Sequence, residues 1–426
     1  MDSGEIATYI PELATADPSW FGIALCTLGG LYQAGHSQVP FTIQSVSKPF
    51  VYALALADRG ADRVLAQVGV EPSGEAFNAI RLDPAGRPFN PMINAGAIVT
   101  AWLVDGDGPD EKFERIRTGL SAFAGRELEV DERVLESEMA TADGNRALCY
   151  LMRSAGTLTC GAEEALSVYF RQCSLLVTAA DLAVMAATLA MGGVDPVTSR
   201  VVIGPTIAQH VLTVMATCGT YDFSGEWLLR AGMPAKSGVS GGLAAALPAQ
   251  FGLGVFSPPL DPHGNSVRAA AVCEELADRY GLHLMRRSVR ELPVFHRVLT
   301  GADLAAGRDR QLLTTNGNAI LICELLSDMG FTGVESIVRD LSGRLGAVRW
   351  LILDLSRVGQ LETVAAAMLT AYARQLTELD VEPLVADPRE RRLLGEQVSE
   401  YRSLAQALRH CARALDPRTG DVKPQT

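Results

Sequence analysis

The sequence predicts an α/β (α+β) protein built from two domains. The first observation is length, because 426 residues exceed what a single hydrophobic core usually serves. The second is patterning: strand-like runs alternate with apolar helical runs over the first 285 residues, and a cleaner alternation follows residue 310. The third is the arginine-rich, irregular stretch between them, which places a linker near residues 287–305.

The first domain is expected over residues 1–286. Its clearest segments are two short strands and two helices, at Phe21–Leu28, Gly252–Phe256, Val177–Met191 and Ser266–Tyr280. Thr178 and Asp181 are three residues apart at the start of the third segment, which is the spacing of a capping box. These elements predict a domain that mixes strands with buried helices.

The second domain is expected over residues 306–416. Its strand candidates are Asn318–Leu326, Val348–Leu355 and Val381–Val385. Its helix candidates are Thr332–Leu345, Leu361–Leu379 and Glu390–Ala414. Strands separated by helices predict a small α/β layer. The tail, residues 417–426, is polar and is expected to be disordered.

Composition limits the partners and the compartment. The net charge of −12 argues against binding nucleic acid and does not favour an anionic membrane. No apolar run approaches the 18 or so residues of a membrane span. The eight cysteines show no C-x-x-C spacing, and the N-terminus lacks the basic start and apolar stretch of a signal peptide. We therefore expect reduced thiols and a cytoplasmic protein.

Lysine is rare in this chain, with four lysines against 33 arginines. Lys48 ends the motif Ser45-Val46-Ser47-Lys48, and Lys236 begins Lys236-Ser237-Gly238. A desolvated lysine can lose its proton, whereas an arginine in a protein cannot. S-x-x-K arises often by chance, but together with a later K-[ST]-G it is the pattern of serine acyl-transfer enzymes of the penicillin-binding and β-lactamase type.

The chemistry of these motifs begins with Ser45, whose hydroxyl needs a base to become a nucleophile. If Ser45–Leu54 is helical, Lys48 projects from the same face and can act as that base when neutral. Its pKa must then be lowered by burial and by nearby positive charge such as Lys236. The free N–H groups of a helix start also suit an oxyanion. The six histidines lie outside these motifs, which argues against a Ser-His-Asp triad and a histidine metal site.

These motifs belong to a longer ordered series that resembles the bacterial-type glutaminases. The series is YIPELA at 9–14, FGIAL at 21–25, FTIQSVSKPF at 41–50, NPMINAGAI at 90–98, SE at 137–138, GNRALCYLM at 144–152, YFRQCSLLVTAADLAVMAATLAMGG at 169–193, TCGTYDFSGEW at 217–227 and PAKSGVSGG at 234–242. The resemblance covers residues 5–285. It implies a β-lactamase/transpeptidase-like fold, in which an antiparallel sheet flanked by helices adjoins a helical subdomain, within about residues 60–210, and the site lies in the cleft between them.

The resemblance also implies an activity, the conversion of L-glutamine and water to L-glutamate and ammonia, without a metal or organic cofactor. Family members are dimers or tetramers, so a homodimer or homotetramer is expected. The residues carried over for substrate binding are Ser45, Asn94, Glu138, Asn145, Tyr169, Tyr221 and Val239. The residues carried over for catalysis are Ser45, Lys48, Tyr169, Tyr221 and Lys236.

Each carried-over residue has a physical role available. Glu138 is the one acid, so we assign it the α-ammonium of glutamine, and the two asparagines suit the carboxylate and the amide. The backbone N–H groups of Ser45 and Val239 would form the oxyanion hole. Tyr169 and Tyr221 are both candidates for relaying a proton, and the sequence does not divide that role between them.

Two other functions remain open. One is a different serine acyl-transfer enzyme on the same fold, such as an esterase or a D-amino-acid amidase. The other is a non-catalytic glutamine sensor, against which the intact Ser45, Lys48 and Lys236 speak. The S-D-N element of β-lactamases is missing, which disfavours penicillin hydrolysis and wall synthesis.

The second domain resembles the STAS domain, a small α/β module of anti-sigma-factor antagonists and sulfate transporters. The resemblance rests on WLILDLSRVGQLETVAAAMLTAY at 350–372. Regulatory members carry a phosphorylatable serine in D-[ST]-S-G at the helix start, where this chain has Glu362-Thr363-Val364-Ala365. The second serine is therefore absent, and Thr363 is the remaining candidate. A role in assembly, stability or ligand sensing is our hypothesis.

Overall fold

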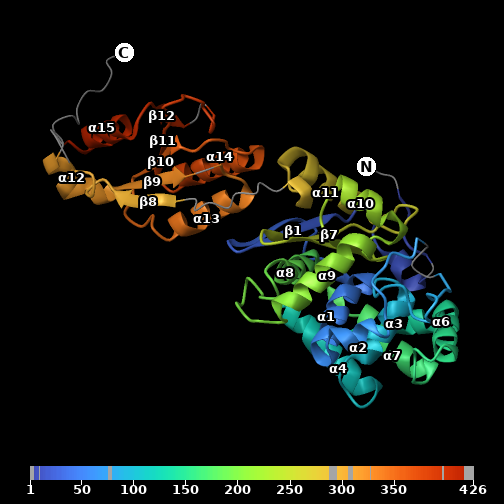
Figure 1. Cartoon of the computed structure of the whole chain (residues 1–426). Helices are drawn as coiled ribbons and strands as arrows, with labels where there is room; N and C mark the ends of the chain where they lie inside the picture. The colour runs from blue at the N-terminus through green and yellow to red at the C-terminus, as the bar shows by residue number, and fades with distance from the viewer. Residues whose placement is uncertain are drawn as a thin grey trace. The chain divides into compact units, whose positions relative to one another are not determined.

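The computed structural model describes residues 4–8, 10–74, 79–286, 295–305, 310–326, 328–395 and 398–416. The chain divides into two compact units (Figure 1). Unit 1 comprises Met1–Asp278 and Leu282–Arg286, and unit 2 comprises Arg279–Gly281 and Arg287–Thr426.

Unit 1 contains a five-stranded antiparallel sheet in the order β2-β1-β7-β6-β5. The strands are β1 (Gly22–Thr27), β2 (Gly30–Gly35), β5 (Ala235–Ser237), β6 (Gly242–Leu247) and β7 (Phe251–Phe256). The pairing of β1 with β7 joins the two ends of the unit, so the helices between them form one continuous insertion. The predicted strands at Phe21–Leu28 and Gly252–Phe256 are confirmed as β1 and β7.

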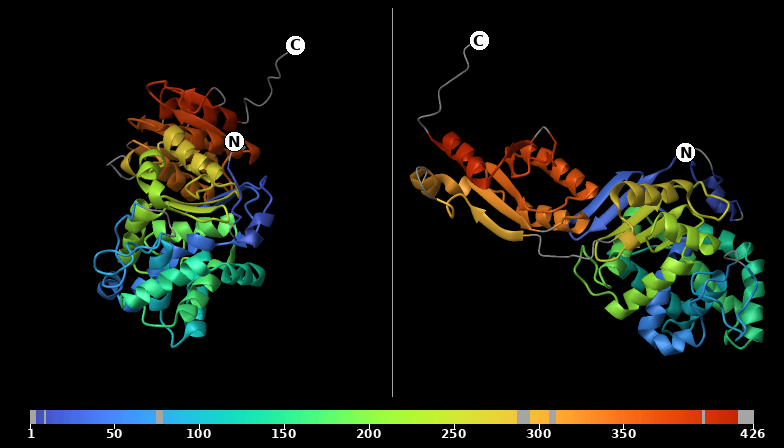
Figure 2. Two further views of the ribbon diagram at one scale, coloured as in Figure 1. Left: turned by 90° about the vertical axis from the view of Figure 1, so that its right-hand side faces the viewer. Right: turned by 45° about the horizontal axis from the view of Figure 1, so that its top comes forward.

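The helices of unit 1 lie on both faces of this sheet and in a separate layer below α8 (Figures 1 and 2). They are η1 (Pro11–Thr15), α1 (Lys48–Arg59), α2 (Ala61–Leu65), α3 (Asn94–Leu103), α4 (Pro109–Ala124), α5 (Glu132–Ala140), α6 (Asp143–Ser154), α7 (Ala162–Cys173), α8 (Ala179–Ala190), α9 (Pro205–Cys218), α10 (Ser224–Arg230) and α11 (Val267–Tyr280). Helix α1 is buried along most of its length among α3, α4 and α9, in the main core.

Helix α8 packs directly on β7 because both surfaces carry small residues. A Cβ atom added at Gly252 would lie 2.0 Å from the Ala187 backbone nitrogen, and one at Gly254 would lie 2.0 Å from the Ala179 carbonyl oxygen. Glycine at these positions therefore permits the close approach of helix and strand. The capping box predicted at Thr178 is confirmed, since its hydroxyl accepts from the Asp181 N–H.

Unit 2 contains a five-stranded sheet in the order β12-β11-β10-β9-β8, in which β9 to β12 are parallel and β8 is antiparallel to β9. Its elements are β8 (Phe295–Thr300), α12 (Arg310–Asn316), β9 (Ile320–Leu326), α13 (Phe331–Ser342), β10 (Trp350–Arg357), α14 (Thr363–Glu378), β11 (Glu382–Ala386), β12 (Ser399–Tyr401) and α15 (Leu404–Leu415). Alternate strand residues pack on α13 and α14 on one face and on α12 and α15 on the other. Strand β8 lies inside the stretch predicted to be a linker, so residues 295–300 belong to the sheet.

The prediction of a helix over Glu390–Ala414 is wrong for its first half. Among the described residues of this segment, only Leu404–Leu415 forms a helix, and Ser399–Tyr401 forms strand β12 beside β11. Asp387, buried at the end of β11, accepts from the Arg389 N–H at 3.0 Å and from Arg391 Nε at 2.7 Å.

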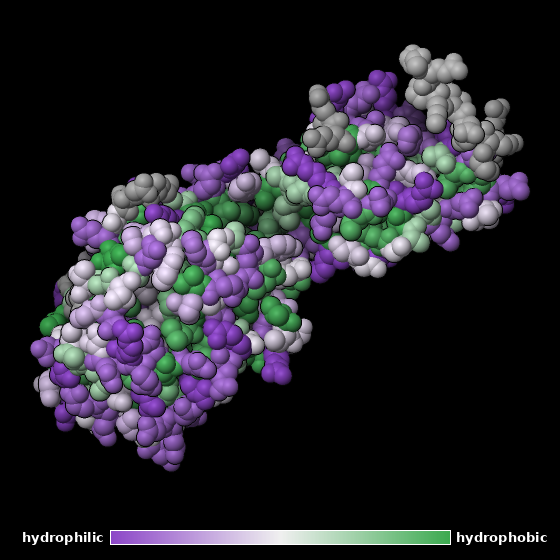
Figure 3. Space-filling model, turned by 180° about the vertical axis from the view of Figure 1, so that it is seen from behind, coloured by the Kyte–Doolittle hydropathy of each residue, from purple (hydrophilic) through white to green (hydrophobic). Residues whose placement is uncertain are grey.

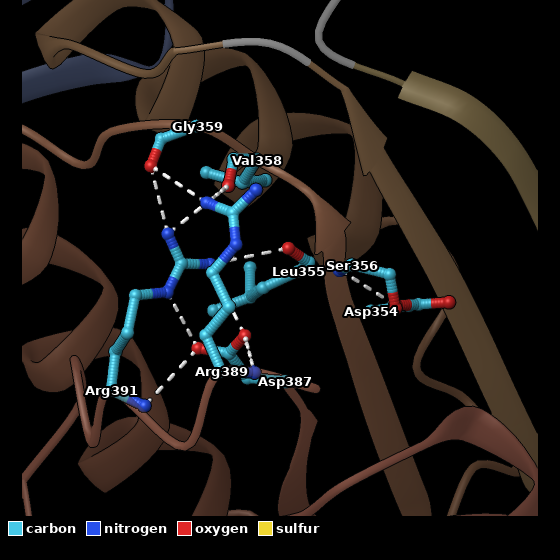
Figure 4. Close-up of polar contacts among 8 residues, drawn as sticks. All are labelled: Asp354, Leu355, Ser356, Val358, Gly359, Asp387, Arg389 and Arg391. Atoms are coloured by element: carbon cyan, nitrogen blue, oxygen red, sulfur yellow. Dashed lines mark hydrogen bonds and ion pairs between the residues drawn. The ribbon is translucent and has the colours of Figure 1, made fainter.

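The arginine side chains at 389 and 391 reach out of this turn. Both donate to the carbonyl oxygens of Val358 and Gly359, in the loop after β10 (Figure 4). Glu390 and Arg392 have φ values of 49° and 50°, in the left-handed region that ends a helix. Tertiary hydrogen bonds thus override the local helix preference of this segment.

Other sequence predictions concern the surface and the termini. In the described part of the chain, all eight cysteines are unpaired, and no helix is long and apolar enough to span a membrane. Hydrophilic side chains are spread over both units on the face drawn in Figure 3. The predicted disordered tail, residues 417–426, lies outside the described residues.

Candidate active site

The Ser45 motif forms a tight turn that runs directly into a helix. A 3-10 turn, η2 (Gln44–Ser47), precedes α1, and the Lys48 N–H donates to the Ser45 carbonyl. The Ser47 hydroxyl donates to the Gln44 carbonyl at 2.7 Å, and Gln172 Nε2 donates to the Ser47 hydroxyl at 2.9 Å. Ser45 and Lys48 are therefore held on one buried turn, as the motif spacing predicts.

Lys48 takes part in a hydrogen-bond network with two amides and one hydroxyl from three other helices. Its Nζ donates to Asn94 Oδ1 at 2.7 Å, and the Tyr169 hydroxyl donates to the same oxygen at 3.2 Å. Asn94 Nδ2 in turn donates to Asn145 Oδ1 at 3.0 Å. The structure thus brings together four predicted site residues from α1, α3, α6 and α7.

The lysine pair is buried, and burial changes its proton affinity. Lys48 is 0% exposed, and burial lowers its pKa to about 8, opposed by the nearby Cys173 and Glu138. The pKa of Lys236 lies well below its ordinary value because of burial and the positive charge of Lys48. From the sequence we expected both burial and Lys236 to lower the Lys48 pKa; in the structure burial is the main cause of that lowering, and the charge of Lys48 contributes to the lowered pKa of Lys236.

Tyr221 connects the serine turn to the strand that carries Lys236. Its hydroxyl hydrogen-bonds with Ser45 and donates to the Ser237 carbonyl at 3.1 Å. Lys236 Nζ lies 3.8 Å from the centroid of the Tyr221 ring and donates to the carbonyls of Gly219 and Ser237 at 2.8 and 2.7 Å. Burial raises the pKa of Tyr221 to about 12, so its hydroxyl keeps its proton at neutral pH.

Glu138, on α5, is the buried carboxyl group of the site. Gln44 Nε2 donates to Glu138 Oε2 at 3.3 Å, and burial raises the pKa of Glu138 to about 8. The sequence reasoning did not name Gln44, although it precedes Ser45 directly. Its side chain reaches Glu138 from a backbone with φ of 47°, which no sequence signal reveals.

Val239 lies buried in the turn after β5. It lines, with Tyr221, a cavity of about 850 Å³ that is also bordered by residues 4–8 and 260–264. A Cβ atom at Gly238 would lie 3.0 Å from Val46 Cγ2, so glycine there lets the Lys236-Ser237-Gly238 strand approach the Ser45 turn. Among the described residues, no group of three or more His, Cys, Asp or Glu could hold a metal ion.

Comparisons with known proteins show the family of this chain. Residues 4–285 match the glutaminase family model. The chain belongs to the glutaminase family. It is 41% identical to the glutaminase of Corynebacterium glutamicum over 389 residues, covering 91% of this chain and 90% of that protein.

Other members of the family differ in length. Glutaminase 1 and Glutaminase 2 of Bradyrhizobium diazoefficiens are 46% and 50% identical, over 89% and 86% of this chain. The chain spans only 63% and 60% of the length of those two relatives. Among solved structures, Mglu superposes with a TM-score of 0.67 at 39% identity, covering 92% of this chain and 95% of its own. The mixed α/β fold is therefore that of glutaminases.

Proposed function

We propose that this protein hydrolyses L-glutamine to L-glutamate and ammonia through a γ-glutamyl-serine intermediate. The observation that carries the proposal is the buried turn in which the Lys48 N–H donates to the Ser45 carbonyl, with Lys48 a fully buried lysine whose pKa lies at about 8. A lysine with that pKa is a proton acceptor for a substantial fraction of molecules near neutral pH. Membership of the glutaminase family supports the same reaction.

In the acylation step, Ser45 Oγ attacks the side-chain amide carbon of glutamine while Lys48 accepts the hydroxyl proton. The oxyanion is stabilised by the backbone N–H groups of Ser45 and Val239. We assign to Tyr221, which hydrogen-bonds with Ser45, the relay of that proton from Lys48 to the leaving nitrogen as the C–N bond breaks, so that ammonia departs and Lys48 is neutral again. Water then attacks the γ-glutamyl ester while Lys48 accepts its proton, the proton passes to Ser45 Oγ as the Ser45–acyl bond breaks, and glutamate leaves.

The roles in substrate binding follow from the chemistry of the buried polar side chains. Glu138 is the buried acid suited to the α-ammonium, and a bound ammonium would favour its carboxylate form. Asn94, Asn145 and Tyr169 supply the amides and hydroxyl for the α-carboxylate and the side-chain amide. Lys236 is proposed to hold Tyr221 and the Ser237 carbonyl rather than to move a proton, because its Nζ donates to two backbone carbonyls. A glutamate form of the related Mglu supports a site of this kind.

The test is release of glutamate and ammonia from glutamine by the purified chain, with asparagine as the control substrate. We expect turnover of glutamine without any added cofactor. Turnover of p-nitrophenyl esters or nitrocefin but not of glutamine would instead support another serine acyl-transfer enzyme. Binding of glutamine without release of either product would support a sensor.

We propose further that the second domain is a STAS-like module that contributes to assembly, stability or ligand sensing. The segment from Trp350 to Tyr372 supports this, since it forms a parallel strand, a loop and a helix in that order. The alignment with the Corynebacterium protein also extends beyond residue 285. Deletion of the residues after 290 tests the role. Unchanged oligomer size, thermal midpoint and kinetics would contradict it.

Two further proposals concern the state of the protein in the cell. We propose a cytoplasmic location, because a reducing compartment suits eight unpaired cysteines, seven of which are buried. We also propose a homodimer or homotetramer, which light scattering of the purified chain would measure.

A further inference from the structure

A short turn at residues 261–265 connects two parts of the candidate active site. It is closed by Asp261, whose side chain accepts from the N–H groups of His263 and Asn265 at 2.9 Å each. Its backbone adds two more hydrogen bonds, from Asp261 N to the Asn265 carbonyl and from Gly264 N to the Asp261 carbonyl. The turn is therefore a firm support for the side chains that project from it.

His263 projects from this turn onto the residues that directly follow Tyr221. Its Nδ1 lies 3.2 Å from Asp222 Oδ1, and the carboxylate can only accept, so the Nδ1–H donates. Its ring stacks on Phe223, with centroids 5.1 Å apart and planes inclined by 24°. His263 thus contacts Asp222 and Phe223, the two residues that follow Tyr221 in the short helix η3 (Tyr221–Phe223).

The backbone of Tyr221, at the start of that helix, has an energetically unfavourable conformation. Tyr221 has a φ of 63°, which a bulky residue adopts only when its surroundings enforce it. Its hydroxyl must nevertheless meet both Ser45 and the Ser237 carbonyl. Contacts that fix the next two residues limit the conformations open to Tyr221.

The other end of the turn reaches the strand of Lys236. Asn265 Oδ1 accepts from the buried Ser237 hydroxyl at 2.6 Å. The carbonyl of that same serine accepts from Tyr221 and from Lys236. One turn therefore contacts Ser237, whose carbonyl accepts from Tyr221 and Lys236, and also the two residues that follow Tyr221.

The contacts of His263 are too exposed to contribute much to folding. The side chains of His263 and Asp222 are 42% and 40% exposed, and pairs of that exposure add little stability. Both residues line the same cavity as Tyr221 and Val239. Because these contacts add little to stability and lie on the wall of the cavity beside Tyr221, we look for their role in the reaction.

We propose that His263 is a positioning residue for the acyl-transfer step, acting through Asp222 and Phe223 to hold Tyr221 against Ser45. The inference rests on the proposed function. His263 itself touches neither Ser45 nor Lys48 through any of these contacts. Its removal leaves Ser45 and Lys48 intact and loosens the group that relays the proton.

The test replaces His263 by Ala and measures glutamine kinetics, with active molecules counted by titration with a diazoketone analogue of glutamine. We expect kcat per titrated site to fall about tenfold, since small misplacements of a reacting group cost that much or more. KM should stay within about twofold, and the thermal midpoint within about 2 °C. His263→Gln, which keeps a side-chain N–H for Asp222 but loses the ring, should give an intermediate kcat.

His410→Ala is the matched control. His410 has the same 42% side-chain exposure, lies 3.6 Å from Glu382 and is tilted on Tyr401 at 5.5 Å, but it belongs to unit 2. The inference is overturned if His263→Ala keeps kcat per site within about twofold of the wild type, if His410→Ala loses as much, or if His263→Gln is no faster than His263→Ala. An inactive wild type would instead refute the proposed function.

Discussion

Unit 1 and unit 2 each bring two basic side chains together at one place, but they use different residues for it. In unit 1, Lys48 and Lys236 are fully buried and donate to amide and backbone oxygens. In unit 2, the Arg391 side chain and the Arg389 backbone N–H donate to the buried carboxylate of Asp387, and both arginine side chains donate to backbone carbonyls (Figure 4).

The difference shows what each cation is suited to do. A lysine whose partners are neutral oxygens keeps a low pKa, so its proton can leave at neutral pH. An arginine stays charged, and beside Asp387 it holds the pKa of that carboxyl below its usual range. The first arrangement allows proton transfer, whereas the second fixes a turn. Each prediction below tests one side of this contrast.

The largest expected effect follows replacement of Ser45 by Ala. Glutamine turnover should fall by at least about 10⁴-fold, because the variant has no hydroxyl to form the acyl intermediate. The thermal midpoint should stay close to that of the wild type, since one buried oxygen is lost and no cavity is opened. Measurable turnover at more than one hundredth of the wild-type rate would exclude the covalent route.

Replacement of Lys48 by Arg should lower kcat by about 10³-fold, because the side chain then stays charged and cannot accept the Ser45 proton. Lys48→Met tests the same loss without adding bulk. Lys112→Met is the matched control, since Lys112 is also buried but donates to the Val104 carbonyl at 2.6 Å, away from the site residues. It should lower stability and leave kcat per titrated site unchanged. A wild-type kcat in Lys48→Arg would rule out Lys48 as the base.

The pH dependence should follow the buried pair of Lys48 and Glu138. Each has a pKa of about 8, and the reaction needs neutral Lys48 and ionised Glu138, so kcat/KM should rise with pH through about 8. The midpoint belongs to the coupled pair rather than to either residue. Glu138→Gln should raise KM and retain a rising limb from Lys48. A flat profile from about pH 6 to about pH 9 would contradict the assignment.

The same lysine also makes a prediction for stability. Its pKa is lowered in the folded state and near 10.4 in the unfolded state, so between about pH 8 and about pH 10.4 the unfolded chain binds more protons. The contribution of Lys48 to the free energy of unfolding therefore rises with pH over that window. Denaturant titrations give the free energy of unfolding of the wild type and of Lys48→Met at about pH 7.5 and about pH 9.5. The increase between the two pH values should be larger in the wild type, and equal increases would contradict a lowered Lys48 pKa.

The smallest effect on activity is expected in the arginine turn of unit 2. Asp387→Asn should lower the free energy of unfolding by about 3 kcal/mol, because it leaves Arg391 without its buried partner. Arg389→Met, at an exposed position, should cost less than about 1 kcal/mol. Neither change should alter kcat per titrated site. Equal losses of stability would show that the buried carboxylate does not anchor the turn.

The sequence predicted most of the elements because their patterns are strong. The strand at Phe21–Leu28, the capped helix after Thr178 and the strand at Val348–Leu355 all appear within a few residues of their expected bounds. The prediction of a helix after Glu390 was wrong because the conformation there depends on the Asp387 carboxylate, directly after β11, and on backbone carbonyls after β10. Helix propensity depends on residue type and near neighbours, so it does not predict hydrogen bonds to residues distant in the sequence.

In the candidate site, too, sequence motifs predicted some residues, whereas others are recognised only from their contacts in the fold. Most of the nine residues that the motifs named fall into two hydrogen-bonded groups, one around Lys48 and Asn94 and one around Tyr221 and Lys236, although their roles remain predictions. Gln44 and His263 were missed because their significance lies in where the fold points them. Gln44 reaches Glu138 across 94 residues of sequence, and His263 reaches Asp222 across 41.

The scarcity of lysine has a practical outcome for handling the protein. Every lysine that the structure describes is buried, and the fourth, Lys423, lies beyond residue 416. Amine-directed dyes, resins and crosslinkers would therefore not reach Lys48, Lys112 or Lys236 while the fold persists. Label found on any of these three lysines becomes a direct count of molecules that have opened.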